Sequence, residues 1–224
     1  MTRNRLIAAL TVSAVVVLDQ LTKFLVKLNM QIGEDIRVFG DWMRIHFVEN
    51  NGMALGLEFA PGSIGKIALS LFRVVAVVVI GWYIIQISKK KERPFYVICV
   101  SLVFAGAIGN IIDSLFYGMI FSSSIGQVAE FLPADGGYES FLHGRVVDML
   151  YFPLINGTFP SWVPVWGGES YEFFRPVFNV ADSAITVGIV LILLFFRDRL
   201  GADLNQQKQK SAGAETEGEA GAEQ

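Results

Sequence analysis

The chain has 224 residues, of which 53% are hydrophobic and 17% are charged, with a formal net charge of −3 and a mean hydropathy of +0.48. Soluble domains carry about 25% charged residues, so this composition excludes an ordinary water-soluble globule and a mainly disordered chain. The one cysteine excludes an intramolecular disulfide, the two histidines disfavour a zinc site, and no basic stripe suits a nucleic acid.

Four apolar stretches are long enough to cross a bilayer core, which takes about 20 helical residues. They lie at 6–28, 64–88, 95–117 and 178–196. Because these runs are continuous rather than alternating, they predict an all-α membrane protein with four transmembrane helices, and not a barrel. The first stretch lacks a small-residue cleavage site, so it is interpreted as an uncleaved anchor rather than a removed signal peptide.

Basic residues predict the orientation of these helices. Three clusters precede the first stretch, separate the second from the third, and follow the fourth: Arg3 and Arg5; Lys89, Lys90, Lys91 and Arg93; Arg197 and Arg199. The positive-inside rule puts these clusters and both termini on the cytoplasmic side, and the connections 29–63 and 118–177 on the outer side. We expect one transmembrane domain, 1–200, and a disordered acidic cytoplasmic tail, 201–224.

Polar side chains interrupt the apolar stretches, although a charge at the bilayer centre costs at least about 2.5–3.5 kcal/mol. At a rise of about 1.5 Å per residue, Asp19, Asp113 and Asp182 fall at one depth toward the outer side. Lys23 follows Asp19 by one helical turn, a spacing that suits an ion pair. An asparagine shares the helix face of each of the other two acids: Asn110 and Asn179. These residues predict one polar site that faces outward.

The outer connection 118–177 carries a fourth acid, Asp148, in GRVVDML, a β-like run able to fold back over the site. We therefore expect a small β-rich element on the outer face of the helices. Ahead of it, apolar residues recur at helix-like spacing: Ile125, Val128, Ala129, Phe131 and Leu132. This spacing predicts a short amphipathic helix on the membrane surface. Because the segment leads directly to Asp148, it is interpreted as a lid over the site, with a disordered insertion as the alternative.

Five segments share their order and their place relative to the spans with one known family. They are DQLTK (19–23), ENNGMALGL (49–57), GNIID (109–113), VVDML (146–150) and FNVADS (178–183). Together they resemble the lipoprotein signal peptidases, also called signal peptidase II. The resemblance implies a four-helix aspartyl protease of the bacterial inner membrane, with its active site toward the periplasm. It would remove the signal peptide of prolipoproteins by cutting before a diacylglyceryl-modified cysteine.

The same resemblance implies the site residues and the partners. The catalytic pair falls on Asp148 and Asp182, and the substrate-binding or supporting positions fall on Asp19, Lys23, Asn50, Gly52, Asn110, Asp113, Asn179 and Ala181. The implied partners are diacylglyceryl-modified prolipoproteins, membrane lipids and peptide inhibitors of the globomycin type. We expect a monomer.

This sequence departs from the family pattern at a few positions. Ser114 stands where the family has an arginine, and Leu55 stands where a phenylalanine is common. Arg145, three residues before Asp148, is a candidate for the missing positive charge. Arg73, in the second apolar stretch, is interpreted as structural or as snorkelling toward the outer surface.

Two carboxylates that share a site cannot both ionise easily, so one keeps a proton. The ionised acid can take a proton from water while the protonated acid polarises the scissile carbonyl, a reaction that needs neither a metal nor a cofactor. Which aspartate holds the proton is left open. A small ion-coupled transporter or proton pathway is the alternative, but the acids leave no relay to the other side, and no inverted repeat is present. A non-catalytic assembly factor is a third interpretation.

Overall fold

The computed structural model describes residues 2–50, 63–90, 92–154, 156–172 and 176–198. The four predicted apolar helices are present as α1 (Arg3–Asn29), α2 (Ser63–Lys89), α3 (Pro94–Ile112) and α5 (Val180–Phe195). The helix α3 continues through a π-helix, η1 (Asp113–Tyr117), into α4 (Gly118–Ile120). In the part of the chain that the structure describes, three helical stretches are long and apolar enough to cross a membrane, and α5 is a shorter apolar helix. The predicted tail, 201–224, lies outside the described residues.

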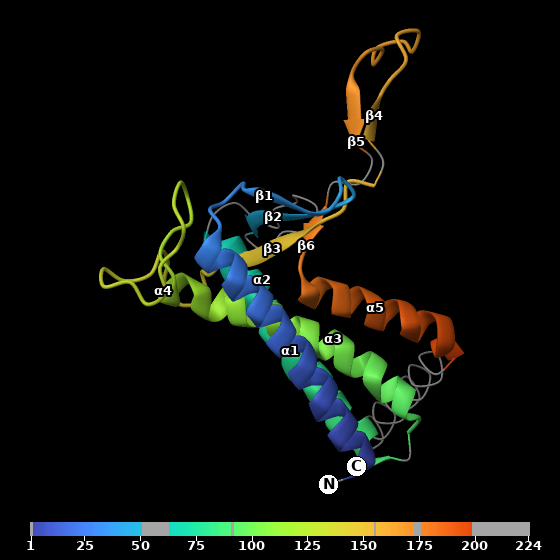
Figure 1. Cartoon of the computed structure of the whole chain (residues 1–224). Coiled ribbons are helices and arrows are strands. Elements are labelled where there is room, and N and C mark those ends of the chain that lie inside the picture. The colour runs from blue at the N-terminus through green and yellow to red at the C-terminus, as the bar shows by residue number, and fades with distance from the viewer. Residues whose placement is uncertain (1, 51–62, 91, 155, 173–175, 199–224) are drawn as a thin grey trace, which may run out of the picture.

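The helix α3 is the centre of the bundle, because α1, α2 and α5 all pack against it (Figure 1). Small residues permit the closest of these contacts: a Cβ atom at Gly106 would lie 2.2 Å from the backbone oxygen of Ala181. Such close backbone approach is typical of helix packing in membranes. Two apolar clusters lie at opposite ends of α1, around Ala8 and around Val26 and Met30. Asp19 and Lys23 lie between them along α1.

A small antiparallel sheet covers the end of the bundle where α1 ends and α5 begins (Figure 1). Its strands are β1 (Asp35–Phe39), β2 (Met43–Asn50), β3 (Val146–Tyr151) and β6 (Val177–Phe178), in the order β1-β2-β3-β6. This confirms the predicted β-rich element and the predicted strand around Asp148. A separate hairpin, β4 (Asn156–Thr158) with β5 (Ser170–Glu172), projects away from the sheet.

The predicted amphipathic helix is wrong, because residues 121–145 form an ordered loop without a helix. The loop folds back on itself through a bridge between Phe121 and Phe131. Its backbone bonds are long-range: the amide of Leu132 donates to the oxygen of Ile120, and the amide of Tyr138 donates to that of Phe121. A positive φ of 52° at Leu132 is also incompatible with a right-handed helix. Of the five apolar residues that suggested a helical face, only Ala129 is buried, and the other four are exposed.

Candidate active site

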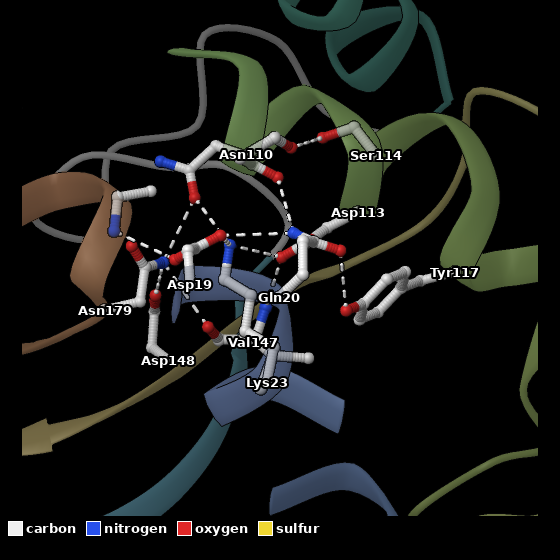
Figure 2. A network of polar contacts seen from close by, with 12 residues as sticks. Asp19, Gln20, Lys23, Asn110, Asp113, Ser114, Tyr117, Val147, Asp148 and Asn179 are labelled. Carbon is white, nitrogen blue, oxygen red and sulfur yellow. Dashed lines mark hydrogen bonds and ion pairs between the residues drawn. The ribbon is translucent and has the colours of Figure 1, made fainter. Parts of the chain in front are cut away.

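A buried lysine joins two helices at the centre of the site (Figure 2). The side chain of Lys23 has no exposed surface, and its Nζ lies 2.9 Å from Asp19 Oδ2 and 2.8 Å from Asp113 Oδ2. The same Nζ donates to Asn110 Oδ1 at 3.1 Å. An ammonium has three protons, so these three acceptors satisfy it completely. The predicted pair between Asp19 and Lys23 is therefore present, and it extends to Asp113 on η1.

Two asparagines connect Lys23 to the predicted catalytic acids by hydrogen bonds. The Oδ1 atom of Asn110 accepts from both Lys23 and Asn179, which turns its Nδ2 toward Asp182 Oδ1, at 2.7 Å. The Nδ2 atom of Asn179 also donates to Asp148 Oδ1, at 2.7 Å. Because each amide has its oxygen and nitrogen fixed by different partners, neither can flip without losing bonds.

Asp182 is positioned by the start of α5, in a capping box with Asn179. The Oδ1 atom of Asn179 accepts from the backbone amide of Asp182 at 2.8 Å, and the backbone amide of Asn179 donates to Asp182 Oδ2 at 3.4 Å. The spacing N-x-x-D thus places Asp182 in the first helical turn, where the helix dipole favours a negative charge. One side chain, Asn179, therefore contacts both predicted catalytic acids.

Asp148 lies on β3 and is buried, with 3% of its surface exposed. Its Oδ2 accepts from Asn50 Nδ2 at 3.2 Å, and Asn50 comes from the end of β2. Burial, followed by the negative charge of Asp182, raises the pKa of Asp148 to about 7. Two acids that influence one another in this way can hold a single proton near neutral pH.

The π-helix η1 fixes β3 beside the bundle. The Oδ2 atom of Asp113 accepts from the backbone amide of Val147 at 3.2 Å, one residue before Asp148. The backbone oxygen of Ser114 accepts from the amide of Gly144 at 3.0 Å. Wide helical turns of this kind leave carbonyl oxygens available and occur often at functional sites. The interruption of α3 therefore sets the position of the strand that carries Asp148.

A bond between a side chain and the backbone connects α1 to α5. Asp19 Oδ1 accepts from the amide of Ala181 at 2.9 Å. Because a Cβ atom at Gly109 would lie 2.5 Å from Asp19 Oδ2, only a glycine fits at this place on α3. Sequence reasoning missed Gln20, whose Nε2 donates to Asp19, to Asp113 and to the oxygen of Gly109. Its position inside a span, next to Asp19, was the signal available.

The predicted substitute for the missing positive charge, Arg145, does not contact Ser114. Gly52 lies outside the described residues. Arg145 pairs with Glu49 at 3.2 Å, and its guanidinium lies over the ring of Tyr138. The guanidinium that contacts Ser114 is instead that of Arg73, with Nη1 donating to Ser114 Oγ at 3.0 Å.

Glu49 lies in a second buried charge cluster, next to Asn50. It also pairs with Lys27, whose Nζ donates to Ser124 Oγ at 2.9 Å and lies 4.7 Å from the ring centre of Tyr138. These contacts join α1, β2 and the loop 121–145. Among the described residues, no group of three or more His, Cys, Asp and Glu side chains has an arrangement able to hold a metal ion.

The chain is similar to known proteins over most of its length. The family model described as signal peptidase (SPase) II matches residues 11–197. A lipoprotein signal peptidase of Porphyromonas gingivalis is 47% identical over 218 residues, which are 97% of this chain and 94% of that protein. One of Amoebophilus asiaticus is 37% identical over 198 residues, which are 87% and 78% of the two chains.

Two solved structures of bacterial membrane enzymes have a similar fold. One aligns with a TM-score of 0.54 at 24% identity, covering 86% of this chain and 88% of the other. The second aligns with a TM-score of 0.53 at 27% identity, covering 84% and 90%. The likeness therefore extends over most of both chains.

Proposed function

Because the chain belongs to the signal peptidase II family of aspartic peptidases, which process prolipoproteins, we propose that Asp148 and Asp182 are its catalytic pair. One observation carries this assignment: Asn179 donates to Asp148 Oδ1 at 2.7 Å and also caps Asp182. A strand and a helix far apart in the sequence thus present two carboxylates to one another through one shared amide. Asp19 and Asp113, by contrast, are each paired with Lys23.

The reaction needs one proton on the pair. The ionised acid accepts a proton from a water molecule, whose oxygen forms a bond to the scissile carbonyl carbon. The protonated acid donates to the carbonyl oxygen, which takes the electron pair of the C=O bond. When the tetrahedral intermediate collapses, the C–N bond breaks and the leaving amine receives a proton from the pair. The products are a free carboxylate on the signal peptide and a new amino terminus.

The substrate we propose is a prolipoprotein whose cysteine carries a diacylglyceryl group, with cleavage directly before that cysteine. Exposed apolar side chains on α1 and α5, including Leu21 and Leu194, allow acyl chains to remain in the bilayer while the peptide reaches the acids. The basic clusters lie toward the opposite ends of the helices, which favours a cytoplasmic location for those ends and a periplasmic location for the site. We propose a monomer in the bacterial inner membrane.

The amides around the pair are proposed to bind the substrate backbone. Asn50 contacts Asp148 Oδ2 from the end of β2, directly before the segment that contains Gly52. These two positions would contact both the substrate and peptide inhibitors of the globomycin type, while Asn110 and Asn179 would hold the two acids in place. Lys23, Asp19, Asp113 and the amide of Ala181 would hold the helices in register.

The test is cleavage of a synthetic diacylglyceryl-modified prolipoprotein by the purified protein in detergent. We expect Asp148→Asn and Asp182→Asn each to fold and to lose kcat by at least about a thousandfold, since each removes one half of the acid–base pair. The matched control is Asp41→Asn, because the side chain of Asp41 is 72% exposed. Near-normal cleavage by either dyad variant would refute the pair. A wild-type protein that moves ions but cleaves nothing would favour a transporter.

A further inference from the structure

Glu49 lies directly before Asn50 on β2, although the proposed reaction does not use it. We propose that Glu49 is a positioning residue that acts through Asn50. Its buried ion pairs hold the end of β2 in the orientation in which Asn50 contacts Asp148 and the substrate. This inference rests on the proposed function, because it extends the binding role given to Asn50. In this scheme Glu49 touches neither the substrate nor the attacking water.

The two carboxylate oxygens of Glu49 pair with two different elements. Its Oε1 pairs with the Nζ of Lys27 on α1, and its Oε2 accepts from Arg145 Nη1 at 3.2 Å, one residue before β3. The side chains of Glu49 and Lys27 are buried, with 3% and 0% of their surface exposed. One carboxylate therefore ties the end of β2 both to a helix and to the neighbouring strand.

Lys27 is itself held by the loop 121–145. Its Nζ donates to Ser124 Oγ at 2.9 Å. The same Nζ lies 4.7 Å from the ring centre of Tyr138 and 5.6 Å from that of Phe121, where the ring electrons attract a cation. The position of Glu49 is thus set by α1 and by the loop, and not only by the pairing of the strands.

Strand geometry directs Asn50 to the face opposite Glu49, because successive side chains of a strand point to opposite faces. In the register of β2 and β3, Glu49 lies opposite the fully buried Val147. Asp148 lies opposite Val48, which shares its face with Asn50. Asn50 Nδ2 donates to Asp148 Oδ2 at 3.2 Å on that face. Fixing Glu49 on one face therefore fixes the amide that faces the acids on the other.

A role in stability alone does not explain a carboxylate at this position. The face of the sheet that carries Glu49 packs on an apolar cluster that includes Phe47 and Val147. A buried ion pair adds little net stability, because desolvation offsets the attraction, and its best-attested use is to select one geometry. An apolar side chain would hold the sheet on the cluster, whereas two directional partners also fix the orientation of the strand end.

The experiment is a double-mutant cycle of Glu49→Gln and Asn50→Ala. It is measured as kcat and KM for the synthetic prolipoprotein and as the dissociation constant of a peptide inhibitor of the globomycin type. For Glu49→Gln we expect KM and this dissociation constant each to rise by about tenfold, and kcat to change by less than about threefold. In the Asn50→Ala background the same substitution should have no further effect, because the residue through which it acts is gone.

The matched control is Asp35→Asn, which removes a carboxylate that contacts the other end of β2. Asp35 lies 3.7 Å from Arg44, and its side chain is 32% exposed. We expect Asp35→Asn to leave KM and inhibitor binding unchanged. An equal rise of KM in this variant would mean that any loosening of the sheet weakens binding, and it would overturn the specific role of Glu49.

An unchanged KM in Glu49→Gln, or the same rise in the presence and absence of Asn50, would also overturn the proposal. If Glu49→Gln does not fold, Arg145→Gln completes the same cycle, because it frees only Oε2 of Glu49 and keeps the pair with Lys27. Its smaller rise of KM should likewise disappear in Asn50→Ala, and a rise that persists there would overturn the proposal.

Failure of the proposed function appears in different variants. An unchanged KM in Asn50→Ala alone would refute the binding role of Asn50, and this inference with it. A wrong catalytic pair would instead appear as cleavage by Asp148→Asn or Asp182→Asn, neither of which belongs to the cycle.

Discussion

The fold alters the ionisation of Asp148. It is buried between β2 and the bundle, and the charge of Asp182 adds to the effect of burial, so its pKa rises to about 7. A carboxyl with such a pKa can remain protonated near neutral pH and still exchange its proton during the reaction. The neighbouring amides hold its position without supplying a positive charge.

We predict that kcat falls as pH rises through about 7, by about tenfold per unit at higher pH, because the ionised form of Asp148 cannot donate to the carbonyl. The free energy of unfolding should also fall as pH rises. The folded state binds more protons than the unfolded state between about pH 4 and 7, so stability declines as pH rises through that window. Thermal unfolding across this range should show a smaller decline in Asp148→Asn. An equal decline in both proteins would contradict the assignment.

At the scale of elements, the site depends on where secondary structures begin and end. The helix α5 begins at Val180 because Asn179 caps it, and α3 changes to η1 at Asp113. Each of these boundaries carries a side chain of the polar network. The same residues therefore terminate or start an element and hold a carboxylate, so that folding and assembly of the site are one process.

We predict that the two roles of Asn179 can be separated by substitution. Asn179→Ala removes the cap and the bond to Asp148, so it should cost about 0.5–2 kcal/mol of stability and most of the activity. Asn179→Ser keeps a capping oxygen but cannot reach Asp148, so it should recover stability without recovering kcat. Thermal unfolding and cleavage of the same preparations provide the measurement. Recovery of both properties by serine would mean that the contact with Asp148 is dispensable.

At the scale of the whole molecule, the loop 121–145 joins the bundle to the sheet. Its Ser124 is fully buried and accepts from Lys27, while the backbone oxygen of Ser124 accepts from Ile32. The hairpin formed by β4 and β5 differs, because its tip exposes 80% of Trp162 and 87% of Val165. The loop 121–145 is thus tied to the bundle by buried contacts, whereas the tip of the hairpin is exposed.

Deleting 122–137 with a short Gly-Ser bridge should therefore lower the melting temperature by at least about 4 °C, since a protein of this size loses roughly 2–4 °C per kcal/mol. Turnover should fall as well. The deletion removes Ser124, which bonds to Lys27, and Lys27 pairs with Glu49. Glu49 directly precedes Asn50, which contacts Asp148. The matched control is deletion of 161–166, the exposed hairpin tip, which should leave both quantities unchanged. An unchanged melting temperature in the first deletion would show that the buried contacts of the loop contribute nothing.

The sequence was sufficient to predict the apolar helices, the strand around Asp148 and the pair between Asp19 and Lys23. These features depend on local spacing and on the high cost of charge in a membrane. It was not sufficient for the contact between Arg73 and Ser114, because the rotation of α2 against α3 depends on packing between distant segments. The helix predicted within 121–145 was wrong for a similar reason, because the loop is held by a bridge between Phe121 and Phe131, which are separated in the sequence.

During synthesis, α1 reaches the membrane before α3 and α5 have been made. Its acid and its lysine, 2.9 Å apart on one helix face, neutralise one another without help from later segments. The spans of α3 and α5 contain Asp113 and Asp182 but no lysine or arginine. When these helices arrive, the cations that attract their acids, Lys23 and Arg73, are already present in the earlier half of the chain. The order of charges along the sequence thus gives biogenesis a direction, in which each incoming acid enters a membrane that already contains its counter-charge.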